Sequence, residues 1–207
     1  MKAAIFKTGI KQCRGATLVE VLVSILLLSF TLLGIAGLMS ATIRHQIGVE
    51  TRSAITLLFS DVTNRLRTNL PQLSGFDSSV YTYGASWASQ QAAIPAPGTN
   101  CGPDATAACT SVERAAYDLW EIRSMTRRAL PQGSLQLSGN TINGLTVTYL
   151  WLDKEFTEHL TATSPPSLRT SVSCSTALQG QQQTCCPIAA SVASTPGVRC
   201  LNFTFIP

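Results

Sequence analysis

An uninterrupted apolar run near the N-terminus constrains this chain more than any other feature. Residues 21–39 read VLVSILLLSFTLLGIAGLM, a stretch of nineteen residues without a charge. At about 1.5 Å per residue, a helix of this length spans about 28 Å, close to the ~30 Å hydrocarbon core of a bilayer. Ser24, Ser29 and Thr31 can return their hydroxyls to helix carbonyls, so a membrane tolerates them. The run predicts a membrane-anchoring helix.

Basic residues that precede the run predict its orientation. Lys2, Lys7, Lys11 and Arg14 all lie before residue 15, and no acidic residue does. The formal net charge of the chain is +4, so the rest of the chain has eleven basic and eleven acidic residues and is neutral. The basicity therefore indicates membrane topology, with the N-terminus on the cytoplasmic side, and gives no sign of a nucleic-acid partner.

A cleaved secretory signal peptide is the alternative explanation of this run. The apolar core of a signal peptide is usually about 7 to 15 residues long, which is shorter than the run. Leu38 and Met39 also interrupt the small residues at 36–41 that a cleavage site would need. The anchoring helix is therefore the favoured prediction.

Glu20 lies immediately before the run, where a carboxylate is costly. A charge at the bilayer centre costs about 3 kcal/mol on insertion scales, and less near an interface. One solution is that Glu20 snorkels toward the cytoplasmic headgroups, on the side where Lys11 and Arg14 lie. The other is cleavage after Gly15. The new α-amine of Ala16 would lie one helical turn from the carboxylate, or could neutralise that of a neighbouring subunit.

The stretch GATLVE at residues 15–20, with a short basic leader before it and VLVSILLLSFTLLG after it, resembles the type IV pilin superfamily. The resemblance implies cleavage between Gly15 and Ala16 by a prepilin peptidase, and N-methylation of Ala16. It also implies that Glu20 recruits the subunit into a filament. Ala16 stands where the family usually has Phe, but the glycine is the more demanding position, and methylation would keep the amine charged.

The resemblance divides the chain into three parts and implies its location. These are a leader peptide at residues 1–15, a hydrophobic transmembrane and assembly helix at 16–40, and a periplasmic head at 41–207. The expected location is the bacterial inner membrane, as a single-pass prepilin, and then the pilus at the cell surface.

A weaker resemblance in the head indicates the subtype. Cys101 and Cys109, followed by AAYDLWEI and ALPQGS, are similar to the corresponding part of PilV-type minor pilins. This implies a structural subunit that helps to initiate or modify pilus assembly. Its implied partners are other minor and major pilins, prepilin peptidase, the inner-membrane assembly platform and membrane lipid. Two alternatives remain open. One is a type II secretion pseudopilin, whose N-terminus has the same pattern, and the other is a stalk-borne adhesin or DNA-binding pilin.

Apolar spacing predicts that the helix continues beyond the membrane segment. The residues that recur mostly at four-residue steps are Ile43, Ile47, Ala54, Leu58, Val62, Leu66 and Leu70. Charged residues fill the other faces, which is typical of an amphipathic helix. One helix over residues 17–70 is therefore expected, ended by Pro71. Gly34 and Gly37 favour bending within it.

A second helix is predicted in the head. Residues 71–110 are rich in Ser, Gly, Ala, Pro and Gln, which predicts a loop with a strand near 80–83. Thr110 and Glu113 form a capping-box pattern at the start of a helix over residues 111–129. The side chains expected along its apolar side are Ala116, Leu119, Trp120 and the stem of Arg123.

The rest of the head predicts strands. Turn signals at Gly139-Asn140 and Asn143-Gly144 are followed by alternation through residues 145–151, and further strands are expected at 169–174 and 198–206. Three or four such strands can form an antiparallel sheet against the amphipathic half of the long helix. The predicted fold class is α+β, a pilin-like long helix packed on a small antiparallel head.

Cysteine usage predicts disulfides in the head. One of the seven cysteines, Cys13, lies in the leader, and an even number in a domain outside the cytoplasm indicates disulfides with fifteen possible connectivities. Cys101 with Cys109 is the most local pairing. Adjacent Cys185 and Cys186 cannot easily bond each other, so each is expected to have a distant partner. The candidates are Cys101, Cys109, Cys174, Cys185, Cys186 and Cys200.

Metal, catalytic and nucleic-acid sites are less favoured. Neither the cysteine spacing nor His45 and His159 fit a zinc pattern, so no metal or cofactor is expected. No nucleophile or phosphate-binding motif accompanies His159, so the chain is not expected to be an enzyme.

A basic patch in the second helix is the candidate site for DNA binding. Arg123, Arg127 and Arg128 lie near its C-terminal end. Cations in this position favour the helix dipole without any ligand, so DNA binding is the less favoured reading.

Overall fold

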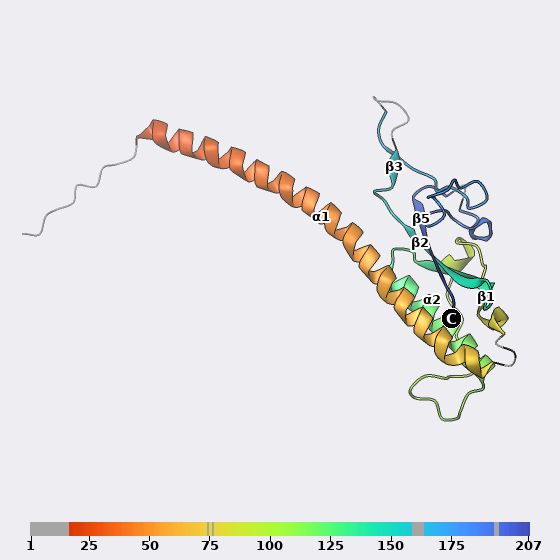
Figure 1. Cartoon of the computed structure of the whole chain (residues 1–207). Helices are drawn as coiled ribbons and strands as arrows, with labels where there is room; N and C mark the ends of the chain where they lie inside the picture. The colour runs from red at the N-terminus through yellow and green to blue at the C-terminus, as the bar shows by residue number, and fades with distance from the viewer. Residues whose placement is uncertain (1–16, 74, 76, 159–163, 193–194) are drawn as a thin grey trace, which may run out of the picture. The chain divides into compact units, whose positions relative to one another are not determined.

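The computed structural model has an α+β fold with one long apolar N-terminal helix and a small antiparallel sheet (Figure 1). It describes residues 17–73, 75, 77–158, 164–192 and 195–207. The chain divides into two compact units, Met1–Gly48 and Val49–Pro207. The predicted cleavage positions Gly15 and Ala16 lie outside the described residues, as does His159.

Helix α1 (Leu18–Asn69) has 52 residues and matches the predicted helix within one residue at each end. Its α-helical conformation is unbroken through Gly34 and Gly37. At its C-terminal end the chain enters the short 3₁₀ helix η1 (Leu70–Gln72), which contains Pro71. Proline disfavours the α conformation in the residue before it, so the predicted end is confirmed.

Helix α2 (Ser111–Ala129) has the bounds that the sequence predicts. The Glu113 N–H donates to Thr110 Oγ1 (3.3 Å), and the Thr110 N–H donates to the Glu113 carboxylate (2.9 Å). This reciprocal capping box satisfies two N–H groups that the first turn would otherwise leave without partners. The hydrogen bond from the Thr110 backbone is the main cause that lowers the pKa of Glu113.

The buried side of α2 differs from the prediction. Ala116 is exposed and Leu119 and Trp120 are only half-buried. The side chains that are buried instead are Ala115, Asp118, Ile122 and Thr126. Leu119 does pack against the core, as predicted, but Ala116 does not. The prediction missed Asp118 because its polar partners in the interior come from distant parts of the chain.

Three strands form the main sheet in the order β1-β2-β5. They are β1 (Ser134–Asn140), β2 (Gly144–Leu152) and β5 (Val198–Phe205), and both pairings are antiparallel. The β1–β2 turn follows the predicted signals, since Asn140 Oδ1 accepts from the N–H of Asn143 (2.7 Å) and Gly144 has φ +98°. Short strands β3 (Thr157–Glu158) and β4 (Ser167–Leu168) form a separate two-stranded sheet.

Two predicted strands are wrong. Within residues 80–83 the chain first completes the 3₁₀ helix η3 (Ser78–Tyr81), which Asp77 caps by accepting from the Ser79 N–H (2.8 Å). Of the predicted strand, only Tyr83 pairs, in an isolated antiparallel bridge with Leu137. Residues 169–174 contribute one isolated parallel bridge, between Ser173 and Cys186. The partner of this second segment is a disulfide-linked loop, which offers no continuous strand for a ladder.

The main core lies within Val49–Pro207, where α1, α2 and the sheet meet. From α1 it takes Leu58, Val62 and Leu66, as predicted, together with Ile55, which the four-residue step missed. Phe59 stacks on Phe203 of β5 with ring centroids 4.7 Å apart. The predicted apolar residues Ile43 and Ile47 are 57% and 53% exposed, so the buried stripe starts after them.

Each outer edge of the main sheet is engaged by another segment. Along β1, Tyr83 and Leu137 exchange two backbone hydrogen bonds of 2.9 Å, and the Gln90 side chain accepts a further β1 N–H at 3.1 Å. Along β5, the Asn202 N–H donates to the Gln183 carbonyl (2.8 Å). Neither edge therefore presents a full row of unpaired backbone groups.

Candidate functional site

The N-terminal half of α1 exposes its apolar side chains. Every described residue from Leu18 to Ile43 is exposed, and Leu18, Phe30 and Leu33 each exceed 60%. One 18-residue window has a mean hydropathy of 2.5, and none of it is buried within the described chain. By length and composition this helix can cross a membrane.

Polar side chains within this apolar half are satisfied by the helix itself. Ser24, Ser29 and Thr31 each donate a hydroxyl hydrogen bond to a carbonyl three or four residues earlier, at 2.7, 2.8 and 2.8 Å. This confirms the sequence expectation. In a bilayer these hydroxyls would need no external partner, which removes most of the cost of burying them in hydrocarbon.

Glu20 lies in the first turn of α1, and it is exposed. Its N–H donates to Thr17 Oγ1 (3.3 Å), so the threonine caps the helix. A carboxylate here is favoured by the positive end of the helix dipole. Among the residues that the structure describes, no ion pair involves this carboxylate, and the predicted partner, the Ala16 amine, lies outside them.

Three disulfides join the six cysteines of the head. The connectivity that the sequence left open is Cys101–Cys109, Cys174–Cys185 and Cys186–Cys200. The most local pairing is confirmed, and the adjacent cysteines have separate partners. Loops closed by such bonds typically gain about 2 to 4 kcal/mol in stability.

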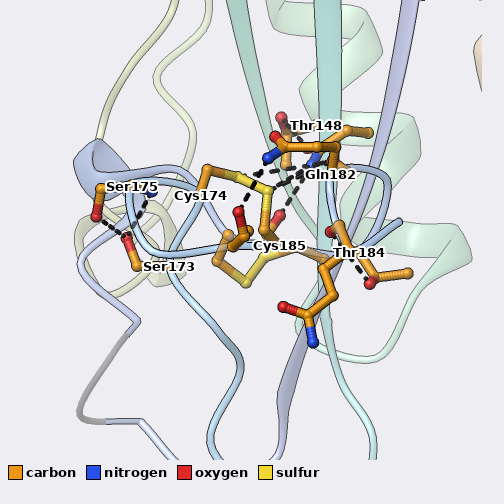
Figure 2. Close-up of a disulfide and its surroundings, with 12 residues drawn as sticks. Thr148, Ser173, Cys174, Ser175, Gln182, Thr184 and Cys185 are labelled. Atoms are coloured by element: carbon orange, nitrogen blue, oxygen red, sulfur yellow. Dashed lines mark hydrogen bonds between the residues drawn. A yellow bond between two sulfur atoms is a disulfide. The ribbon is translucent and has the colours of Figure 1, made fainter. Parts of the chain in front are cut away.

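One of the two C-terminal disulfides, Cys186–Cys200, fastens the preceding segment to β5, and the other, Cys174–Cys185, closes a loop within that segment. Cys186 and Cys200 are buried in a small second cluster with Leu150 and Val198 of the sheet. Figure 2 shows the neighbouring Cys174–Cys185 disulfide with Thr148 of β2 close by. The cysteines could be identified from the sequence, whereas the polar contacts around them could not.

A charged network links α1 to α2 inside the head. Arg65 of α1 forms ion pairs with Asp61 (2.8 Å), Glu121 (2.6 Å) and Asp118 (3.2 Å). Asp118 is buried, and its second carboxylate oxygen accepts from the Tyr81 hydroxyl (3.0 Å). The sequence offered one signal for this network, the i,i+4 spacing of Asp61 and Arg65.

Burial and hydrogen bonding have opposite effects on the pKa values of the charged groups in this network. Burial alone would lower the pKa of Arg65, but the hydrogen bonds to Asp61 and Glu121 raise it above its usual value. Burial raises the pKa of Asp118, although Tyr81 and Arg65 work against that rise. The arginine is thus held in its charged form beside an aspartate that is costly to bury.

Two buried tyrosines give a matched test of this packing. Both Tyr81 and Tyr149 are fully buried, and burial raises the pKa of each. The Tyr81 hydroxyl contacts Asn69 and Asp118, whereas the Tyr149 hydroxyl has no hydrogen-bond partner among the described residues. We expect Tyr81→Phe to lower the free energy of unfolding by about 2 kcal/mol and Tyr149→Phe to change it by less than about 1 kcal/mol.

Urea unfolding of the two variants measures both effects. An equal loss for the two would contradict the assigned contacts.

A polar hollow of about 290 Å³ lies beside the network, lined by Arg65, Thr68, Asn69, Arg114 and Asp118. Its charged side chains are engaged with one another or with backbone, as in the contact of Arg114 with the Cys101 carbonyl. Over the described ranges, no group of three or more His, Cys, Asp or Glu side chains is placed to hold a metal ion.

The arginines at the end of α2 are largely engaged within the head. Arg123 lies over the Tyr83 ring, 4.2 Å from its centroid. Arg127 donates to the carbonyls of residues 91–92, both at 3.2 Å. Arg128 is exposed. Two of the three guanidinium groups therefore hold the 71–110 segment against α2, a structural use that needs no DNA.

No protein-family model matches the chain, and comparison with curated proteins and with solved structures finds no match.

Proposed function

We propose that this chain is a minor pilin, a non-catalytic subunit of a type IV pilus that is stored in the inner membrane and then joins the filament. The observation that carries the proposal is the exposed apolar half of α1 with a carboxylate in its first turn, in the same chain as a disulfide-bonded α+β head. The GATLVE stretch and its basic leader support the family, and the resemblance over residues 101–152 favours a pilus over a secretion system.

Apolar burial alone does not drive such a helix out of the membrane. Lipid chains are as apolar as leucine, so transfer from lipid to a filament core gains little from the hydrophobic effect. Close packing and polar pairing must supply the difference. Glu20 fits this role because an unpaired carboxylate is costly in lipid, whereas pairing it with the charged terminus of a neighbouring subunit would remove that cost and set the register.

The proposal also accounts for the disulfides of the head and names the expected partners. Its disulfides suit an oxidising compartment outside the cytoplasm. The partners would be prepilin peptidase, the assembly platform, other pilins and membrane lipid.

Mass spectrometry of purified surface filaments tests the proposal. We expect filaments sheared from the cell to contain this protein as a chain that begins at Ala16. Filaments that lack the protein, or a mature chain with another first residue, would contradict it. Recovery only in an envelope fraction, together with a defect in protein secretion, would favour the type II secretion pseudopilin instead.

A further inference from the structure

The loop between Cys174 and Cys185 is exposed and carries no charge. Its residues 178–184 are all exposed, with Leu178 at 72%. Local turns give it some structure of its own, since the Cys185 N–H donates to the Gln181 carbonyl (2.9 Å). It also has two attachments, the disulfide at its base (Figure 2) and a set of hydrogen bonds to β5.

Asn202 of β5 makes all of these hydrogen bonds. Its side-chain Nδ2 donates to the carbonyls of Gln182 (2.8 Å) and Cys185 (2.9 Å). Its backbone N–H donates to the carbonyl of Gln183 (2.8 Å). One residue thus holds three carbonyl groups within four consecutive positions of the loop.

The orientation of the Asn202 amide is fixed from β2. Thr148 lies opposite Asn202 in the sheet, is 1% exposed, and donates its hydroxyl to Asn202 Oδ1 (2.7 Å). The amide has one oxygen acceptor and one NH₂ donor. Because the oxygen faces the threonine donor, the NH₂ group must face the loop carbonyls.

The disulfide acts at a different place from these bonds, although Asn202 Nδ2 also contacts Cys174 Sγ (3.8 Å) and Cys185 Sγ (3.5 Å). It joins the two ends, and its stabilising effect acts mainly by restricting the unfolded chain. It holds none of the carbonyls at residues 182–183. We infer that Asn202, and not the Cys174–Cys185 disulfide, sets the conformation of the loop, so that the loop keeps its shape when this disulfide is reduced. This inference is independent of the proposed role in a pilus.

Hydrogen exchange of the full-length protein in detergent micelles tests the inference, with peptides that cover residues 178–185. Asn202→Asp keeps the side-chain size but replaces the donor by an acceptor, and we expect loop exchange to rise about tenfold or more. For the Cys174→Ser, Cys185→Ser double variant we expect a rise below about threefold. Peptides from α2 report whether the rest of the head is intact.

Thr148→Val is a milder variant that removes only the hydroxyl that orients the amide. We expect its loop exchange to lie between those of the other two variants. The inference is overturned if the double serine variant raises loop exchange as much as Asn202→Asp does, or if Asn202→Asp leaves it unchanged. Should Asn202→Asp also raise exchange in α2, Thr148→Val decides, and an unchanged loop in that variant overturns the inference.

Discussion

Replacing Glu20 with glutamine is expected to leave the protein in the membrane and to lower its amount in filaments by about tenfold or more. A central charge costs about 3 kcal/mol on insertion scales, and relief of even half of that cost on assembly corresponds to about one factor of ten. Glutamine keeps the length of the side chain and suits the same position in the first turn of a helix. The change therefore removes the charge without removing the cap that Thr17 provides.

Immunoblots of sheared filaments and of membrane fractions measure this effect. Glu50→Gln is the matched control, because Glu50 is an exposed acid on the same helix that lies beyond the apolar half. It should enter filaments at the wild-type level. Normal incorporation of the Glu20→Gln variant would remove the electrostatic basis of the proposed assembly step.

Replacing Arg65 with methionine should lower the free energy of unfolding of the head by about 3 kcal/mol. The change removes the ion-pair partner of the buried Asp118 carboxylate and leaves only the weaker charge interaction with Arg114. Breaking a buried ion pair in this way typically costs about 3 to 5 kcal/mol. The lower end is expected because the Arg65 side chain is 24% exposed. Thermal unfolding followed by circular dichroism measures the loss, and Arg67→Met on the exposed face of the same helix is the control.

The loss caused by Arg65→Met should shrink as the pH falls. Burial already raises the pKa of Asp118 above its usual 3.8, and loss of the arginine raises it further. A group whose pKa is higher in the folded state binds its proton more tightly there, so acidification through that pKa favours the folded variant. An Arg65→Met defect that grew at acidic pH would contradict the assignment of Asp118 as the unpaired charge.

Local sequence patterns predicted the elements of this fold better than its interior contacts. The bounds of both long helices follow from caps, apolar spacing and Pro71, which act within a few residues. The β1–β2 hairpin follows from its Asn and Gly turn residues in the same way. Residues 169–174 could not be assigned correctly, because their conformation depends on which cysteines pair.

In the candidate site, too, the contacts between near neighbours were predictable from sequence and the contacts between distant residues were not. The hydroxyl contacts of the apolar half were predicted from sequence, because their acceptors are one turn away, and the role of Glu20 stays a prediction. Asp118 and Asn202 were missed, since their partners come from positions far along the chain, such as Arg65 and Thr148. A lone aspartate in a helix gives no sign that it points inward until the distant arginine is known.

The engaged edges of the main sheet have a consequence for crowding. Exposed strand edges template pairing with other molecules, which leads to domain swapping and amyloid-like aggregation. Here Tyr83 and Gln90 bind backbone groups of β1, and the Gln183 carbonyl accepts from the Asn202 N–H near the middle of β5. Edges engaged in this way offer fewer free backbone groups for pairing, so copies of such a domain can stand close together with less tendency for their sheets to merge.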